Sequence, residues 1–117
     1  MINIFTVISI LCVHWIADFI LQTDYMAKNK STDIKALLLH VFVYSSCFFI
    51  FPLTSDNHKL YLLPLITFVC HFLTDFITSK VNKSLIGNNH YFFVAIGFDQ
   101  LLHFIQLLVT YDYLINQ

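Results

Sequence analysis

The chain consists of four long apolar stretches separated by short polar connectors. The stretches are continuous and do not alternate with polar positions, which favours helices over strands. Each is close to the ~20 residues that a helix needs to cross the ~30 Å hydrocarbon core of a bilayer. The first stretch has no basic leader and no small-residue cleavage site, so we expect a retained helix. The predicted helices cover about residues 2–23, 34–53, 60–80 and 91–114.

Composition strengthens this interpretation. Of the 117 residues, 58% are hydrophobic and 11% are charged, whereas soluble domains average roughly 45–50% and about 25%. A water-soluble fold of this length could not bury so much apolar surface. We therefore predict an all-α fold, an integral membrane four-helix bundle that forms a single domain over residues 1–117.

The lysines predict an orientation. Three lie between the first and second stretches and two between the third and fourth, while the middle connector has only Lys59. By the positive-inside rule, the first and third connectors face the cytoplasm and both termini face away from it. The expected location is the inner membrane of a bacterium, with membrane lipids as neighbours. A net charge of −1 without arginine argues against a nucleic-acid partner.

A short internal repeat relates the two halves. "CVHWIADFI" at 12–20 aligns with "VCHFLTDFI" at 69–77, which pairs His14 with His71 and Asp18 with Asp75. "LLLHVF" at 37–42 echoes "QLLHFI" at 100–105. These matches predict two tandem two-helix repeats related by an axis along the membrane normal.

Polar residues inside the apolar stretches form the candidate site. Histidine and aspartate are spaced i, i+4 in three of the stretches, which places both on one helix face. Counting ~1.5 Å per residue from the predicted cytoplasmic ends, the candidates lie about 8 to 18 Å deep, in one layer of the cytoplasmic half. Buried aspartates are costly in a membrane and mark function by default. The candidate metal ligands are His14, Asp18, His40, His71, Asp75, Asp99 and His103.

Imidazole and carboxylate are ligands for divalent metals, with zinc favoured here over iron or manganese, as one or two ions. The leading hypothesis is a metal-dependent hydrolase that acts on an ester or phosphoester of a lipid or lipid-linked substrate, with Asp18, Asp75 and His40 as candidate catalytic groups. Three alternatives remain: a transporter or channel for protons or divalent metal, a small accessory protein of a bacterium or phage, and polar pairs that only fix helix packing.

The motifs "HWIADFILQTDYMAKNK", "LLLH", "HFLTD" and "DQLLH" resemble the membrane protein family called Domain of Unknown Function 3307. The resemblance covers nearly the whole chain. It implies a small helical inner-membrane protein of bacteria or their phages, with no established activity. The polar pattern is also loosely similar to that of membrane-bound metal-dependent hydrolases. One departure is Tyr44, which stands where a second histidine would follow His40.

Overall fold

All regular secondary structure is helical in the computed structural model, which describes all 117 residues and contains no strand. The all-α prediction is confirmed. The helical elements, in chain order, are α1 (Ile4–Trp15), the π-helical η1 (Ile16–Ile20), α2 (Asp24–Asn29), α3 (Ile34–Ser46), the 3₁₀ turn η2 (Cys47–Phe49), α4 (Ile50–Leu53), the 3₁₀ turn η3 (His58–Tyr61), α5 (Leu62–Ser84) and α6 (Asn89–Ile115).

Side-chain caps explain where several helices begin. Asn3, Thr23 and Asn88 each precede a helix and accept a hydrogen bond from the backbone three residues later. Such caps satisfy amides that have no partner within the helix. The cap at Thr23 also explains a difference from the sequence prediction. The first helical path ends at Ile20, not near residue 23, because Thr23 is extended and starts the separate helix α2.

Three helical segments are long and apolar enough to cross a membrane: Ile34–Leu53, His58–Ser84 and Asn89–Ile115. The path Ile4–Ile20 is apolar but shorter. Crossing of the membrane stays a prediction for all four segments, and the first is the shortest of them.

The distribution of polar residues is inverted relative to a soluble protein. Ten of the 25 buried residues are polar or charged, while large apolar side chains such as Phe5, Phe42, Leu65 and Phe93 are more than half exposed. Exposed apolar surface on this scale marks contact with lipid or with other apolar partners. The fold thus hides its polar groups and presents its apolar ones.

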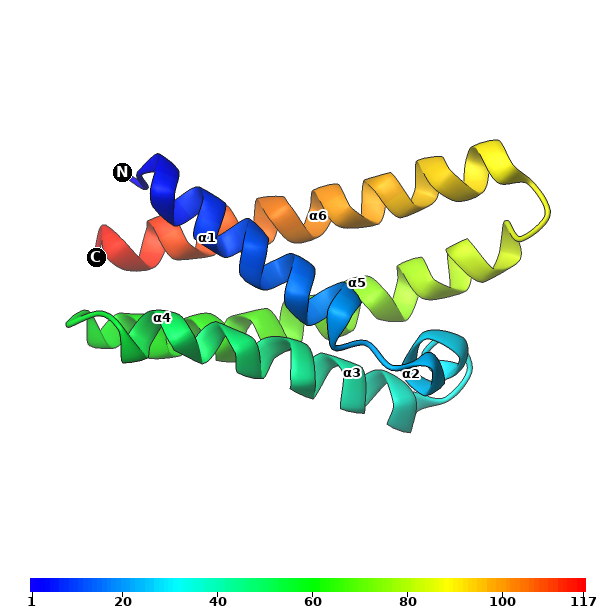
Figure 1. The fold of residues 1–117 in the computed structure, drawn as a ribbon, viewed down its shortest axis with the longest axis horizontal. Helices are drawn as coiled ribbons and strands as arrows, with labels where there is room; N and C mark the ends of the chain where they lie inside the picture. Colours follow the sequence, from blue (N-terminus) through cyan, green and yellow to red (C-terminus); the bar gives the residue numbers. More distant parts are fainter.

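The two ends of the molecule differ. Figure 1 shows both termini and α4 at one end, with α2 and the connection between α5 and α6 at the other. Helix α5 packs against both α3 and α6. An apolar core includes Phe48, Phe51, Leu60 and Leu114, which belong to η2, α4, η3 and α6. Helix α4 and the end of α6 lie at the end of the molecule that carries the termini (Figure 1). The buried histidines and aspartates lie between this core and the end that carries α2.

Candidate metal centre

The π-helical segment at the end of α1 holds the first acid of the site. Asp18 lies within Ile16–Ile20, where the amide of Leu21 donates to the carbonyl of Ile16 at 2.9 Å. This wider turn contains an extra residue and changes the direction of the side chains that follow it. Single π turns are rare and frequently occur at functional sites. Asp18 is 4% exposed.

The other acids and imidazoles come from α3, α5 and α6. His71 and Asp75 lie one turn apart on α5, with 3.5 Å between Nε2 and Oδ2. Asp99 and His103 on α6 are 3.3 Å apart between Oδ1 and Nε2. His40 comes from α3. All seven residues predicted from the sequence are buried, with exposed fractions of 8% or less.

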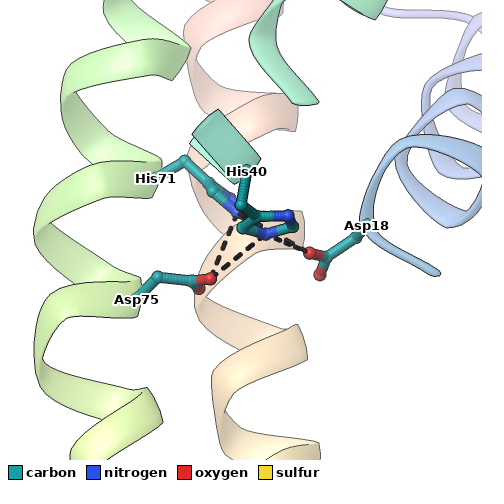
Figure 2. A group of neighbouring side chains, drawn as sticks. All are labelled: Asp18, His40, His71 and Asp75. Atoms are coloured by element: carbon teal, nitrogen blue, oxygen red, sulfur yellow. Dashed lines mark hydrogen bonds and ion pairs between the residues drawn. The ribbon is translucent and has the colours of Figure 1, made fainter. Parts of the chain in front are cut away.

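Four of these residues form the first group that could hold a metal ion: Asp18, His40, His71 and Asp75. In Figure 2, His71 and Asp75 project from one helix, and Asp18 approaches from the opposite side. The Nε2 atoms of His40 and His71 are 3.1 Å apart. Each of them lies 3.1 to 3.6 Å from Asp18 Oδ1 and from Asp75 Oδ2. Four ligand atoms from three segments of the chain, η1, α3 and α5, thus converge on one point.

Five of the six separations within this group are close to those of tetrahedral coordination, and the sixth, between Asp18 and Asp75, is within 4.8 Å. An ion with metal–ligand bonds of about 2.0–2.2 Å places neighbouring ligand atoms of a tetrahedron roughly 3.3–3.6 Å apart. The five distances given above fall between 3.1 and 3.6 Å. A small contraction or expansion of side chains would therefore suffice to bind an ion such as zinc.

Three buried polar atoms of the first group have no hydrogen-bond partner, and only the carboxylate oxygen among them favours a cation. Asp18 Oδ1 accepts no well-aligned hydrogen bond, although His40 Nε2 is 3.1 Å away and buried carboxylate oxygens normally accept one. The Nδ1 atoms of His40 and His71 also lack partners, whereas metal-bound histidines usually donate from their second nitrogen. The His71 ring is instead held by stacking between Tyr44 and His103, at centroid distances of 3.6 and 4.2 Å.

A second group lies beside the first and shares one of its acids. It consists of Asp18, Asp99 and His103. His103 Nε2 lies 3.1 Å from Asp75 Oδ1 and so links the two groups. Thr78 donates a 2.5 Å hydrogen bond to Asp99 and fixes that carboxylate.

His14 lies outside both groups. Its Nε2 is 2.7 Å from the side-chain oxygen of Gln100, and its Nδ1 is 2.6 Å from the Tyr44 hydroxyl. A carbonyl oxygen only accepts, so Nε2 carries the proton and Nδ1 accepts from the tyrosine. Both nitrogens of His14 therefore have partners in this arrangement. His14 orients the site through Gln100, whose amide nitrogen donates to Asp18 and Asp99 at 3.2 and 3.1 Å.

Two further residues of the site were missed by sequence reasoning. Gln100 could have been found as an amide inside an apolar stretch, next to Asp99. Lys30 follows α2, and its ammonium donates to Asp75 Oδ2 at 2.9 Å. Burial lowers the pKa of Lys30, but the carboxylates of Asp75 and Asp18 outweigh burial and raise it. No sequence signal separates Lys30 from the other connector lysines.

The fold and the site define a small helical protein with three apolar segments of spanning length and a buried cluster of histidine and aspartate. Residues 6–117 match the model of the family described as "Protein of unknown function (DUF3307)". The chain belongs to this family, as the sequence motifs predicted. No curated protein matches the chain, and no solved structure does.

Proposed function

We propose that this protein is an integral membrane metalloprotein whose first group binds a divalent metal, with zinc as the first choice. One observation carries the proposal. Asp18 Oδ1, the Nε2 atoms of His40 and His71, and Asp75 Oδ2 are separated as the ligands of a tetrahedral ion would be.

The charge of the site supports a divalent cation. Asp18, Asp75 and Asp99 contribute three negative charges, and Lys30 is the positive side chain that pairs with them. With neutral imidazoles the cluster carries two net negative charges. Uncompensated charge is expensive to bury. One divalent ion would neutralise the cluster, whereas a metal-free site would need two protonated imidazoles.

Asp75 differs from the other members of the first group because both its oxygens already accept hydrogen bonds. Lys30 donates to Oδ2, and His103 lies 3.1 Å from Oδ1. We therefore assign Asp18, His40 and His71 as the persistent ligands. Asp75 either completes the tetrahedron or withdraws toward Lys30 and acts as a general base. Catalytic zinc sites keep three protein ligands and one open position.

Hydrolysis is the reaction that this arrangement suits best. A bound metal would activate water and polarise an ester or phosphoester. Asp75 would accept the proton of the attacking water, and His103, between Asp75 and Asp99, would pass a proton to the leaving group. The expected substrate is a lipid or a lipid-linked ester or phosphoester, because the site lies among apolar segments of spanning length.

We place the protein in the inner membrane of a bacterium, as a four-helix bundle with the end that carries α2 in the cytoplasm. The lysine-rich connectors support this orientation. A continuous pore is disfavoured because the apolar core, with fully buried Phe48, Leu60, Leu63 and Leu107, fills the interior toward the termini. A closed-ended site suits an enzyme better than a transporter.

Elemental analysis tests the metal site directly. The full chain is purified in detergent without chelators, and bound zinc, iron and manganese are measured per protein chain. We expect about one zinc, since one tetrahedral set is present. Asp18→Asn and His40→Ala should lose it. Asp56→Asn and His90→Ala are the matched controls, because both residues are exposed and lie outside the two groups.

The same measurement separates the alternatives. A metal-free wild type would leave polar pairing or proton movement as the role of the cluster. Metal retained equally in Asp18→Asn and His40→Ala would place the ion elsewhere. Loss of metal in His14→Ala but not in His40→Ala would make His14 the ligand and His40 the residue that orients the site.

A further inference from the structure

A basic cavity lies next to the candidate metal centre. It has a volume of about 490 Å³ and lies between α2, the end of α5 and the start of α6. Lys28, Lys30 and Lys83 line it, and none of its lining residues is acidic. Three cationic side chains around one cavity, with no acid among them, create a site for an anion.

Three residues that line the cavity carry buried polar atoms without a partner, which a side-chain rotation would bring to the cavity. Ser79 is 8% exposed, and its hydroxyl has no hydrogen-bond partner. The side-chain oxygens of Gln22 and Asn82 are also buried and unpartnered. The oxygen and nitrogen of an amide side chain exchange places on rotation, so both residues can present donors instead. A hydroxyl, two amides and three lysines suit a group with several acceptor oxygens, such as a phosphate.

Lys30 connects this cavity to the metal centre. Its side chain lines the cavity, and its ammonium contacts Asp75 Oδ2 at 2.9 Å. An anion in the cavity would therefore lie one side chain away from the first group. A phosphoester bound there would be close to the groups proposed to cleave it.

An apolar groove lies between α5 and α6, on the other side of Asn82 from the basic cavity. It has a volume of about 380 Å³ and shares Asn82 with the basic cavity. Apolar side chains line most of it: Leu73, Ile77, Val81, Ala95, Phe98 and Leu102. A molecule with a phosphate head and a hydrocarbon tail would match both parts at once.

We propose that the basic cavity binds the phosphate of an anionic lipid whose hydrocarbon chain lies in the groove between α5 and α6. This inference deepens the proposed function, since it names the substrate class of the same site. Its binding step requires no metal. The lysines attract the headgroup, the amides and Ser79 orient it, and the groove selects a lipid over a soluble phosphate.

Native mass spectrometry of the full chain in neutral detergent tests this. Dioleoyl phosphatidic acid is the probe, dioleoyl phosphatidylcholine has the same chains, and inorganic phosphate is the soluble competitor. We expect phosphatidic acid to bind more tightly than phosphatidylcholine. Replacing Lys28 and Lys83 with glutamine should weaken phosphatidic acid binding by about fivefold for each lysine, or roughly 25-fold together.

Lys80→Gln is the matched control. Lys80 lies on α5 near the same end and carries the same charge, but its ammonium contacts Phe76 and does not line the basic cavity. It should change binding little. Equal losses in Lys80→Gln and Lys83→Gln would reduce the effect to diffuse charge and overturn the proposal. Equal binding of both lipids, or displacement of phosphatidic acid by an equal concentration of inorganic phosphate, would also overturn it.

The same titration in Asp18→Asn separates the two proposals. Intact lipid binding in this variant, with metal lost, supports both. If the wild type binds phosphatidic acid but contains no metal, the lipid site is supported and the metal site is contradicted. If the wild type binds metal but does not prefer phosphatidic acid, the metal site is supported and the lipid site is contradicted.

Discussion

Replacing Lys30 with methionine should raise the affinity of the protein for zinc. The Lys30 ammonium is 2.9 Å from Asp75 Oδ2, and an ion bound to that oxygen would be about 2.0–2.2 Å from it. Ammonium and ion would therefore be at most roughly 5 Å apart. Methionine preserves much of the side-chain volume but removes the charge. The variant leaves Asp75 without its ammonium partner and removes the one positive side chain near the three carboxylates.

The size of the effect follows from Coulomb's law. A divalent and a monovalent cation 5 Å apart repel by roughly 6–7 kcal/mol at an effective dielectric constant of about 20. The flexible lysine can move into the basic cavity, which relieves most of this repulsion. We take about 1.4 kcal/mol, or a tenfold gain in affinity, as the minimum expected change.

A competition titration with a fluorescent zinc chelator, on protein in detergent, measures this affinity. Lys80→Met is the control, since Lys80 is exposed and contacts Phe76 of its own helix. A weaker zinc affinity in Lys30→Met would mean that the lysine supports the ion, against the charge argument. A similar gain in Lys80→Met would show that the effect is not local. Without zinc, Lys30→Met should be the less stable protein, by on the order of 1–3 kcal/mol, because Asp75 loses its ammonium partner and keeps only the neighbouring imidazoles.

Three stability predictions concern residues around the site and the turn between α5 and α6, and each is checked by thermal or denaturant unfolding in detergent. Tyr44→Phe removes the hydroxyl bonded to His14 but keeps the ring, so it should cost about 1 kcal/mol; no loss would mean that this hydrogen bond is unimportant. Gln100→Leu removes the amide that joins an imidazole to two carboxylates, and should cost on the order of 1–3 kcal/mol or more. Gly87→Ala should destabilise the protein by about 1 kcal/mol, because the glycine has a φ of 98°. Gly97 lies inside α6, with open space where a Cβ would be, so Gly97→Ala should be neutral or stabilise the protein by roughly 0.5–1 kcal/mol. Equal effects at the two glycines would contradict the backbone explanation.

Local features of this protein could be predicted from the sequence because they depend on one helix at a time. Continuous apolar stretches predicted the helices, and the structure has helical segments in all four. The i, i+4 spacing of His71 with Asp75, and of Asp99 with His103, placed each pair on one face. Helix geometry repeats every 3.6 residues whatever the helix packs against, so such contacts follow from spacing alone.

Contacts between segments could not be predicted in this way. The sequence suggested seven candidate ligands without deciding which share an ion. The structure divides six of them into two groups that share Asp18 and leaves His14 bonded to Gln100 and Tyr44. The π turn at Asp18 and the insertion of Lys30 beside Asp75 had no signal of their own.

The sequence alone determined that the chain is helical, that its family is DUF3307 and that paired histidines and aspartates share one face of their own apolar helix. Only the tertiary structure decided which of their atoms meet, at what separation, and which lysine enters the cluster. The reason is physical: spacing along one helix sets the face a side chain occupies, but the distance between side chains on different helices depends on how those helices pack.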